Sequence, residues 1–251
     1  MIKKSFIFLP NISTIKEKTI WQQGVHTWND FLNKEKIKGI SEQRKEQYDK
    51  EIQKAYKNLD VENMPYFQEQ FPSTEQWRLY NYFKEDAVYL DIETCQNNMD
   101  ITVIGMFDGF DTKVMLKGNN LYRELFLDEI QRHKLIVTFN GSSFDIPLLQ
   151  KYFDFKVEVP HVDLRHVCSR IGLVGGLKQI EQELNIKRPD ELELLRGHNA
   201  VELWKMWRVT ADRHYLDLLL KYNQEDVINL RQIADYSVKE LWSNTFDLGG
   251  L

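Results

Sequence analysis

One stretch of the sequence combines strand-forming residues with two acidic residues near its end: Ala87-Val88-Tyr89-Leu90-Asp91-Ile92-Glu93-Thr94. Its β-branched and aromatic residues favour a buried strand. Side chains two positions apart in an extended chain point to the same face, so Asp91 and Glu93 project together while Ile92 points into the core. Adjacent carboxylates repel, and half-buried ones need a cation nearby. The stretch alone leaves two interpretations open, a divalent metal site or a solvated strand end.

The composition of the 251-residue chain indicates a folded protein outside the membrane. Hydrophobic residues make up 42% of the chain and aromatic residues 12%, which is enough for a sizeable core. No apolar run approaches the roughly 18 residues of a transmembrane helix, so we expect no membrane-spanning segment. Two cysteines, Cys95 and Cys168, have no metal-ligand spacing. They indicate a reducing, cytoplasmic location without disulfide bonds.

The charge distribution divides the chain into a basic arm and an acidic body. Residues 1–58 contain 12 Lys and Arg against 7 Asp and Glu, whereas the remainder contains 21 against 31. The overall net charge of −5 argues against a protein that coats nucleic acid indiscriminately. A basic arm could contact phosphates while the acidic body binds metal ions. The alternative for the arm is an ordinary solvated helical surface.

The first 85 residues are predicted to be helical. One helix is expected to end at Trp21, and a second to begin at Trp28, where Thr27 and Asp30 come close to a capping box. Two short helices in residues 1–35 resemble a degenerate helix-hairpin-helix motif. Its hairpin sequence, Asn11-Ile12-Ser13, lacks the glycine that gives a phosphate access to the backbone. Two roles are open for the hairpin, direct contact with nucleic acid and a purely structural cap, and the missing glycine favours the cap. Residues 36–85 are predicted to form a helical connector, with helices at 41–58 and 73–83.

Residues 86–245 have the pattern of an α/β domain. Strands are expected at 87–94, 100–107, 112–116 and 135–139, with a short one around 157–159. Helices are expected at 121–133, 163–171, 177–185, 190–208, 211–220 and 222–241. This order implies a central mixed β-sheet flanked by helices. The chain would then be this domain with an N-terminal helical extension.

Two further stretches place acidic residues where they could join the first pair. Asp145 ends the sequence Asn140-Gly141-Ser142-Ser143-Phe144-Asp145, directly after the expected strand 135–139. Tyr222 and Asp226 lie one turn apart on a late helix. Asp226 falls on the apolar side of that helix, where an unpaired carboxylate is costly. It therefore needs a cation or hydrogen bonds.

Together, the three stretches resemble the three exonuclease motifs of the DEDD superfamily of DnaQ-like, ribonuclease-H-like 3′–5′ exonucleases. The overall layout is most similar to the YprB-type ribonuclease-H-like predicted exonucleases. In the histidine subclass of the superfamily, a His stands five residues before the last Asp, and here that position is Lys221. The tyrosine subclass has Tyr four residues before it, as at Tyr222. The resemblance therefore favours the tyrosine subclass, DEDDy.

The resemblance implies a ribonuclease-H-like three-layer fold and a hydrolase that uses two divalent cations, Mg²⁺ or Mn²⁺. It assigns the metal ligands and the residue that orients the attacking water: Asp91, Glu93, Asp145 and Asp226 as ligands, and Tyr222 for the water. Asn140 is placed to bind the terminal nucleotide by hydrogen bonds and Phe144 by stacking, with core packing as the alternative for Phe144. Lys178 is a weaker candidate for a phosphate contact.

The expected function is hydrolysis of phosphodiester bonds at nucleic-acid 3′ ends, with release of nucleoside 5′-monophosphates. A single-stranded or frayed end is the expected substrate. Two alternatives remain open, an RNA-processing 3′–5′ exoribonuclease and a non-catalytic nucleic-acid-binding module with a retained metal pocket. The sequence points to no protein partner and does not distinguish DNA from RNA.

Overall fold

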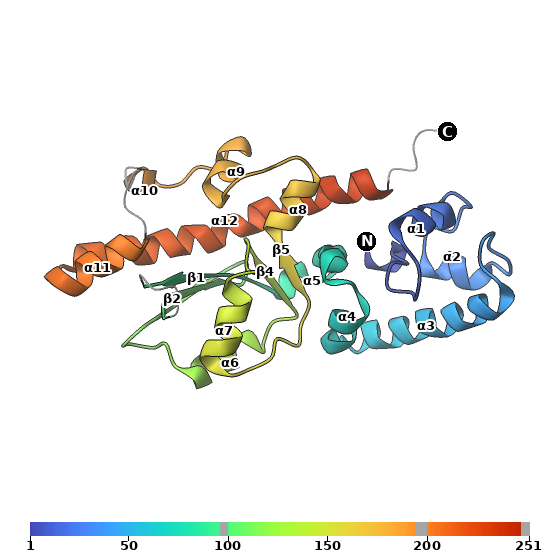
Figure 1. Ribbon diagram of the computed structural model, residues 1–251, viewed down its shortest axis with the longest axis horizontal. Helices are drawn as coiled ribbons and strands as arrows, with labels where there is room; N and C mark the ends of the chain where they lie inside the picture. Colours follow the sequence, from blue (N-terminus) through green and yellow to red (C-terminus); the bar gives the residue numbers. More distant parts are fainter. Residues whose placement is uncertain (96–99, 194–199, 247–251) are drawn as a thin grey trace.

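A five-stranded mixed sheet forms the centre of the computed structural model, which describes residues 1–95, 100–193 and 200–246 (Figure 1). The strands lie in the order β3-β2-β1-β4-β5. They are β1 (Ala87–Thr94), β2 (Ile101–Phe107), β3 (Thr112–Leu116), β4 (Leu135–Thr138) and β5 (His161–Asp163). The first three strands pair antiparallel, whereas β1 with β4 and β4 with β5 pair parallel. The expected α/β fold with a central mixed sheet is confirmed.

Helices cover both faces of the sheet (Figure 1). On one face lie α6 (Arg123–Ile130) and α7 (Asp145–Phe153). The long helix α12 (Arg213–Phe246) packs across β1 and β2 on the other face, and α8 (Leu164–Arg170) and α9 (Leu177–Glu183) pack against it. Two more helices, α10 (Asp190–Glu193) and α11 (Ala200–Thr210), precede it. No helix of these described ranges is long and apolar enough to cross a membrane.

Alternation along β1 sends its side chains into two separate cores. Val88 and Ile92 pack in the core beneath α6 and α7, whereas Tyr89 belongs to the core that includes α12. Burial of each large apolar side chain stabilises the fold by roughly 1.5–3 kcal/mol. A shift of one residue would expose these side chains, so their burial determines which face of β1 points to each core. Asp91 and Glu93 share the face of Tyr89 because they lie two and four residues further on. The sheet thus presents both carboxylates to α12.

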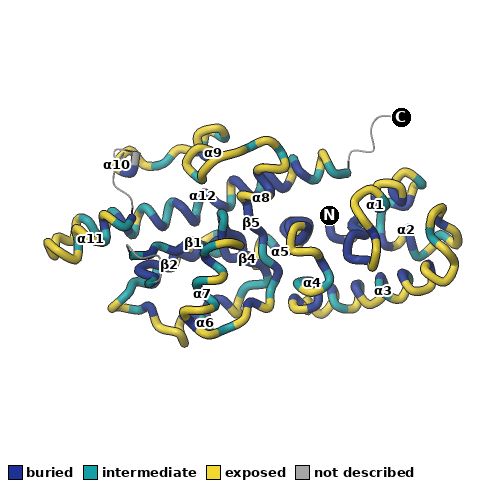
Figure 2. Tube along the Cα trace, in the orientation of Figure 1, coloured by how far each residue is buried: buried dark blue, intermediate teal, exposed yellow. Residues whose placement is uncertain are grey.

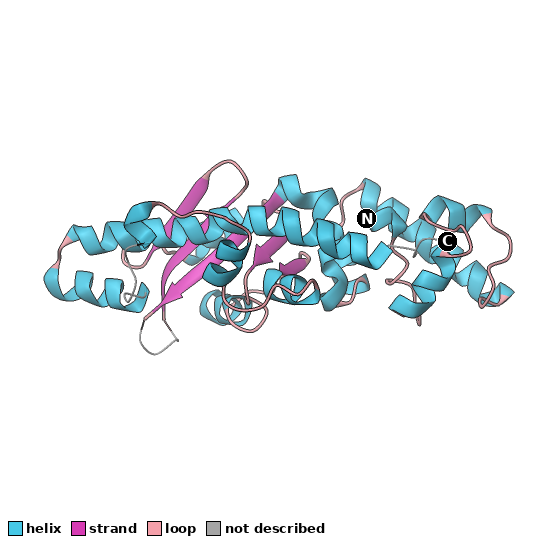
Figure 3. Cartoon of the chain, turned by 90° about the horizontal axis from the view of Figure 1, so that it is seen from above, coloured by secondary structure: helices cyan, strands magenta, loops and turns pink. Residues whose placement is uncertain are grey.

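The N-terminal region is a helical layer beyond one end of the sheet (Figure 3). Its elements are η1 (Ile2–Lys4), α1 (Thr14–Trp21), α2 (Trp28–Asn33), α3 (Glu42–Asp60), α4 (Met64–Gln70), η2 (Ser73–Leu79), α5 (Tyr80–Phe83) and η3 (Lys84–Asp86). The predicted capping box of Thr27 and Asp30 is confirmed at the start of α2. The outer surface of the N-terminal region is exposed, while the residues that face inward are buried (Figure 2). The helical extension is confirmed, and the boundaries at 35 and 85 and the helix-hairpin-helix resemblance stay predictions.

A buried ion pair holds the N-terminal region together, and an aromatic contact attaches this region to the domain. Arg78 in η2 and Glu17 in α1 have side chains with 0% exposure and lie 2.8 Å apart. The Glu17 carboxylate also accepts hydrogen bonds from the backbone N–H groups of residues 6 and 7. Near the end of α12, the ring of Phe246 contacts that of Trp21, with 5.0 Å between ring centroids. One hydrophobic core therefore runs from the N-terminal helices to the sheet.

Five expected elements differ from the structure. The helices expected at 211–220 and 222–241 are the single helix α12, which has no Gly or Pro to interrupt it. The strand expected around 157–159 is wrong, because the ladder with β4 begins only after Pro160, at His161. The helix expected at 73–83 is mostly the 3₁₀ helix η2. The helix expected at 190–208 comprises α10 and α11, and its residues 194–199 lie outside the described residues.

Candidate metal centre

Three carboxylates converge at the end of β1. Asp91, Glu93 and Asp226 each offer one oxygen, and the three oxygens lie within 4.8 Å of one another. The first two come from alternate positions of β1, and the third comes from α12, which crosses the strand. These residues line a cavity of about 380 Å³ together with Tyr222 and Lys178. The structure thus brings together three of the four carboxylates that the sequence analysis selects.

The fourth carboxylate, Asp145, lies beside this cluster at the first position of α7. It is 3% exposed, and its Oδ1 accepts a hydrogen bond from the backbone N–H of Ile92 at 3.1 Å. It is not one of the three residues whose oxygens converge. Its negative charge nevertheless raises the pKa of Asp91 and of Glu93. Asp145 therefore belongs to the electrostatic surroundings of the cluster.

All four carboxyl groups have a raised pKa. Burial, followed by the charge of Asp226, raises the pKa of Asp91 and of Glu93 well above the ordinary values. Burial also raises the pKa of Asp226 to about 6, although Arg188 opposes this shift, and raises the pKa of Asp145 to about 7. Bound protons or a bound cation would reduce the repulsion among these carboxylates.

The donor set fits a divalent cation. Asp91 and Glu93 form no ion pair within the described part of the chain, so their charges have no basic side chain bonded to them. Carboxylate oxygens are the hard ligands that Mg²⁺ and Mn²⁺ prefer. Octahedral Mg²⁺ has ligands at about 2.0–2.1 Å, so two of its oxygens lie up to roughly 4.2 Å apart, close to the spacing of this cluster.

Two side chains that the sequence analysis did not select hold the carboxylates in place. Asn223 donates a hydrogen bond from Nδ2 to Asp91 Oδ2 at 2.9 Å. Arg188 donates to Asp226 and, at 2.7 Å each, to both oxygens of Glu181. The position of Asn223 beside Tyr222 on the late helix was a usable signal. Arg188 gave none, because its contact with Asp226 spans 38 positions of sequence.

Two cations lie close to the ring of Tyr222. Lys178 Nζ is 4.8 Å from the centroid of its ring, and Arg188 Cζ is 5.3 Å from it. Both distances are within the range of cation–π attraction. Burial, and then the charges of Asp226 and Glu93, raise the pKa of Tyr222 above its ordinary value, so the hydroxyl is protonated at neutral pH. It can orient a water molecule by hydrogen bonding but cannot act as a base.

Asn140 and Phe144, which the sequence analysis selected as substrate contacts, lie outside the lining of this cavity. Asn140 Oδ1 accepts a hydrogen bond from Arg165 Nη1 at 2.8 Å. Phe144 is partly buried against the core beneath α6 and α7, which agrees with the packing alternative. Phe139, one residue before Asn140, lines the cavity instead. Alternation at the end of β4 is a signal that could have found it.

A mixed sheet whose middle strand ends in paired carboxylates, with a third carboxylate on a crossing helix, defines an RNase H-like α/β domain. The chain belongs to the RNase_H superfamily, whose family model matches residues 88–238. The matched range contains all four carboxylates and Tyr222. A search of curated proteins found no match.

Proposed function

We propose that this protein is a metal-dependent 3′–5′ exonuclease of the DEDDy type, similar to the YprB-type family. The observation that carries the proposal is the convergence of Asp91, Glu93 and Asp226 within 4.8 Å, with Tyr222 in the same cavity. Membership of the RNase_H superfamily supports a nuclease-type hydrolase acting on nucleic acid. The order of the acidic residues and the tyrosine one turn before Asp226 favour the exonuclease subclass.

Asp91, Glu93 and Asp226, with Asp145 beside them, would hold two divalent cations, Mg²⁺ or Mn²⁺. When bound, such ions stabilise the charge that develops on a phosphate and on its leaving oxygen, and they lower the pKa of a water molecule.

The chain itself supplies orientation around this centre. Asn223 fixes the rotation of the Asp91 carboxylate, and Arg188 fixes that of Asp226. The protonated hydroxyl of Tyr222 positions the attacking water, and Lys178 places a positive charge at the cavity rim for a phosphate.

The proposed substrate is a single-stranded or frayed 3′ end, from which nucleoside 5′-monophosphates are released. Phe139 offers an aromatic face within the cavity for the terminal base. Asn140 and Phe144 stay proposed contacts of the same terminal nucleotide, with core packing as the alternative for Phe144.

Shortening of 5′-labelled DNA and RNA strands tests the proposal. We expect a ladder of products in Mg²⁺ or Mn²⁺, no shortening in EDTA, and protection by a blocked 3′ end but not by a blocked 5′ end. Asp226→Asn should abolish shortening, whereas Asp217→Asn, an exposed position on the same helix, should not. Parallel DNA and RNA arms decide between a deoxyribonuclease and an exoribonuclease. Salt-dependent binding of strands without any shortening would support the non-catalytic module instead.

A further inference from the structure

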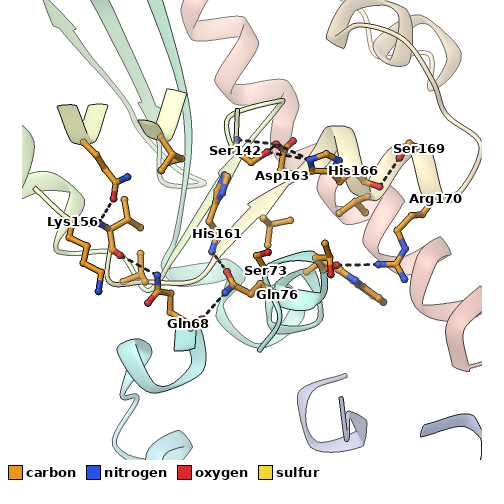
Figure 4. Close-up of a pocket in the computed structure, with 18 residues that line it drawn as sticks. Gln68, Ser73, Gln76, Ser142, Lys156, His161, Asp163, His166, Ser169 and Arg170 are labelled. Carbon is orange, nitrogen blue, oxygen red and sulfur yellow. Dashed lines mark hydrogen bonds and ion pairs between the residues drawn. The ribbon is translucent and has the colours of Figure 1, made fainter. Parts of the chain in front are cut away.

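A second cavity, of about 650 Å³, lies between the N-terminal helices and the RNase H-like domain. In Figure 4, Gln68 and Gln76 of α4 and η2 form one side, and His161 of β5 and Arg170 of α8 come from the domain. Lys156, from the loop before β5, also lines it. The volume is within the range of about 300–1,000 Å³ that small-molecule sites occupy.

This cavity adjoins the metal centre through the loop between β4 and α7. Phe139 at the start of that loop lines the first cavity, and Ser142 lines the second. The carboxylate of Asp163 holds the loop by accepting hydrogen bonds from the backbone N–H groups of Asn140 at 2.8 Å and Ser142 at 3.0 Å. These hydrogen bonds hold the loop in place between the two cavities. A ligand that extends over the loop can therefore reach both cavities.

The cavity combines an apolar floor with polar groups and basic side chains. Its apolar lining residues are Trp77, Ile146, Val157, Val159, Val162 and Val167. The hydroxyl and amide groups come from Ser73, Thr74, Ser142, Ser169, Gln68, Gln76 and Gln150. His161 adds no charge, because burial lowers its pKa to about 4. A flat ring with hydrogen-bonding edges would suit such a lining.

Among the described lining residues, Lys156 is a cation without a carboxylate partner. Lys156 is exposed and forms no ion pair among the described residues, and Arg170 lies over the ring of Trp77 with 5.4 Å from Cζ to the centroid. Arg170 also pairs with Glu75 at 3.0 Å, outside the lining. Asp163 is the one carboxylate among the described lining residues, and the N–H donors of the loop already occupy it. The unpaired charge of Lys156 beside the apolar lining residues thus suits an anion attached to a ring.

We propose that this cavity binds one nucleotide unit, with its base against the apolar lining residues and its phosphate at Lys156, which lies at one end of the cavity (Figure 4). Two ligands contain such a unit. One is a nucleotide of the bound strand, upstream of the cleaved 3′ end, and the other is a free nucleoside monophosphate. The first ligand rests on the proposed nuclease function. The second does not, so the two proposals can fail separately.

Two variants of the lining test the proposal, with one matched control. Ser73→Trp fills an exposed lining position, and Lys156→Glu reverses the charge without altering the core. The control is Lys151→Glu, which changes another exposed lysine, on α7, that does not line the cavity. The probes are AMP and dAMP by isothermal titration calorimetry, and 5′-fluorescein oligonucleotides of graded length by anisotropy. The anisotropy series uses the Asp226→Asn background so that no strand is cut.

We expect both lining variants to weaken binding about tenfold, the size of one base-stacking contact, and the control to leave it unchanged. Weakened AMP or dAMP binding identifies a free mononucleotide. A gain in affinity above a threshold strand length, lost in both variants and without AMP binding, identifies a nucleotide of the strand. Equal affinity of wild type and all variants for every probe would overturn the proposal. Failure of the nuclease function shows separately, as wild-type protein that shortens no strand in any metal.

Discussion

Arg188 donates a hydrogen bond to Asp226, so that a protein cation stands inside the acidic cluster. The Arg188 side chain is 7% exposed and also binds both oxygens of Glu181, whereas its Nη1 is buried without a partner among the described residues. Asn229 of α12 adds a further hydrogen bond to Glu181 at 3.0 Å. Arg188 thus joins α9 and α12 at the site where the carboxylates converge.

Replacement of Arg188 should destabilise the protein. Arg188→Gln leaves two buried carboxylates, Glu181 and Asp226, without their cation, and loss of one partner of a buried ion pair costs about 3–5 kcal/mol. The free energy of unfolding, measured by denaturant titration without metal, should fall by that amount. Arg213→Gln, which removes an arginine from an exposed pair, should change it by less than about 1 kcal/mol. Equal losses in the two variants would contradict the role of Arg188.

Binding of Mg²⁺ or Mn²⁺ should stabilise the wild-type protein. An ion that binds only the folded state adds about 2.7 kcal/mol at a concentration of 100 times its Kd. Asp91→Asn should abolish this gain in thermal unfolding, because it removes a carboxylate of the cluster. The exposed Asp217→Asn variant serves as the control and should keep the gain. An undiminished gain in Asp91→Asn would place the ions elsewhere.

In the metal-free protein, Asp226 and Asp145 should contribute a loss of stability as the pH rises from about 4 to about 7. The pKa of Asp226 is about 6 and that of Asp145 about 7, against about 4 in the unfolded chain, so the folded state binds more protons in this window. This contribution should level off above these two folded pKa values, whereas Asp91 and Glu93, whose pKa is raised well above the ordinary value, extend the loss to higher pH. His161 acts in the opposite direction between about pH 4 and 6.5, because its folded pKa is lowered.

The difference between wild type and Asp226→Asn separates these effects, since His161 is common to both proteins. As the pH rises from about 4 to about 7, the free energy of unfolding of the wild type should fall by about 2–4 kcal/mol relative to that of Asp226→Asn. Denaturant titrations in EDTA at several pH values measure it. A difference that is constant with pH, or that favours the wild type at high pH, would contradict the raised pKa of Asp226.

The paired carboxylates of β1 could be predicted from sequence because alternation in a strand is local. The residues at 91 and 93 share a face whatever the rest of the chain does, and apolar neighbours fix which face is buried. The same holds for the capping box of Thr27, which involves residues three apart. The inward orientation of Asp226 followed from helical periodicity. These parts of the site required no knowledge of the tertiary structure.

Other parts of the site depend on packing between distant segments. Arg188 reaches Asp226 from a loop without periodicity, and no local pattern assigns it a partner. The second cavity arises because η2 packs beside β5. These two elements are about 80 residues apart in the sequence, and no strand ladder joins them. The start of β5 at His161 was set by the ladder with β4 rather than by strand propensity around Val157. Such features follow from tertiary contacts, which a single sequence does not display.

Gly105 of β2 is directly opposite Asp91 in the sheet, and α12 passes close above it. A Cβ at this position would lie 2.1 Å from Asn223 Oδ1 and 3.2 Å from Val227 Cγ1. Gly105→Ala should therefore push Asn223 away from Asp91 and lower the stability of the metal-free protein by about 1–3 kcal/mol. It should also reduce the stabilisation by Mg²⁺ or Mn²⁺, because the Asp91 carboxylate loses the bond that orients it.

A double-mutant cycle distinguishes this mechanism from a general disturbance of β2. Asn223→Ala removes the atoms that the new methyl group meets first, so Gly105→Ala should cost less in that background than in the wild type. We expect a coupling free energy of about 0.5–3 kcal/mol, as for residues in direct contact. Denaturant titrations of the four proteins measure it. Strict additivity would mean that Gly105 acts through the backbone of β2 and not through Asn223, and the close approach of β2 to α12 would then have no part in orienting Asp91.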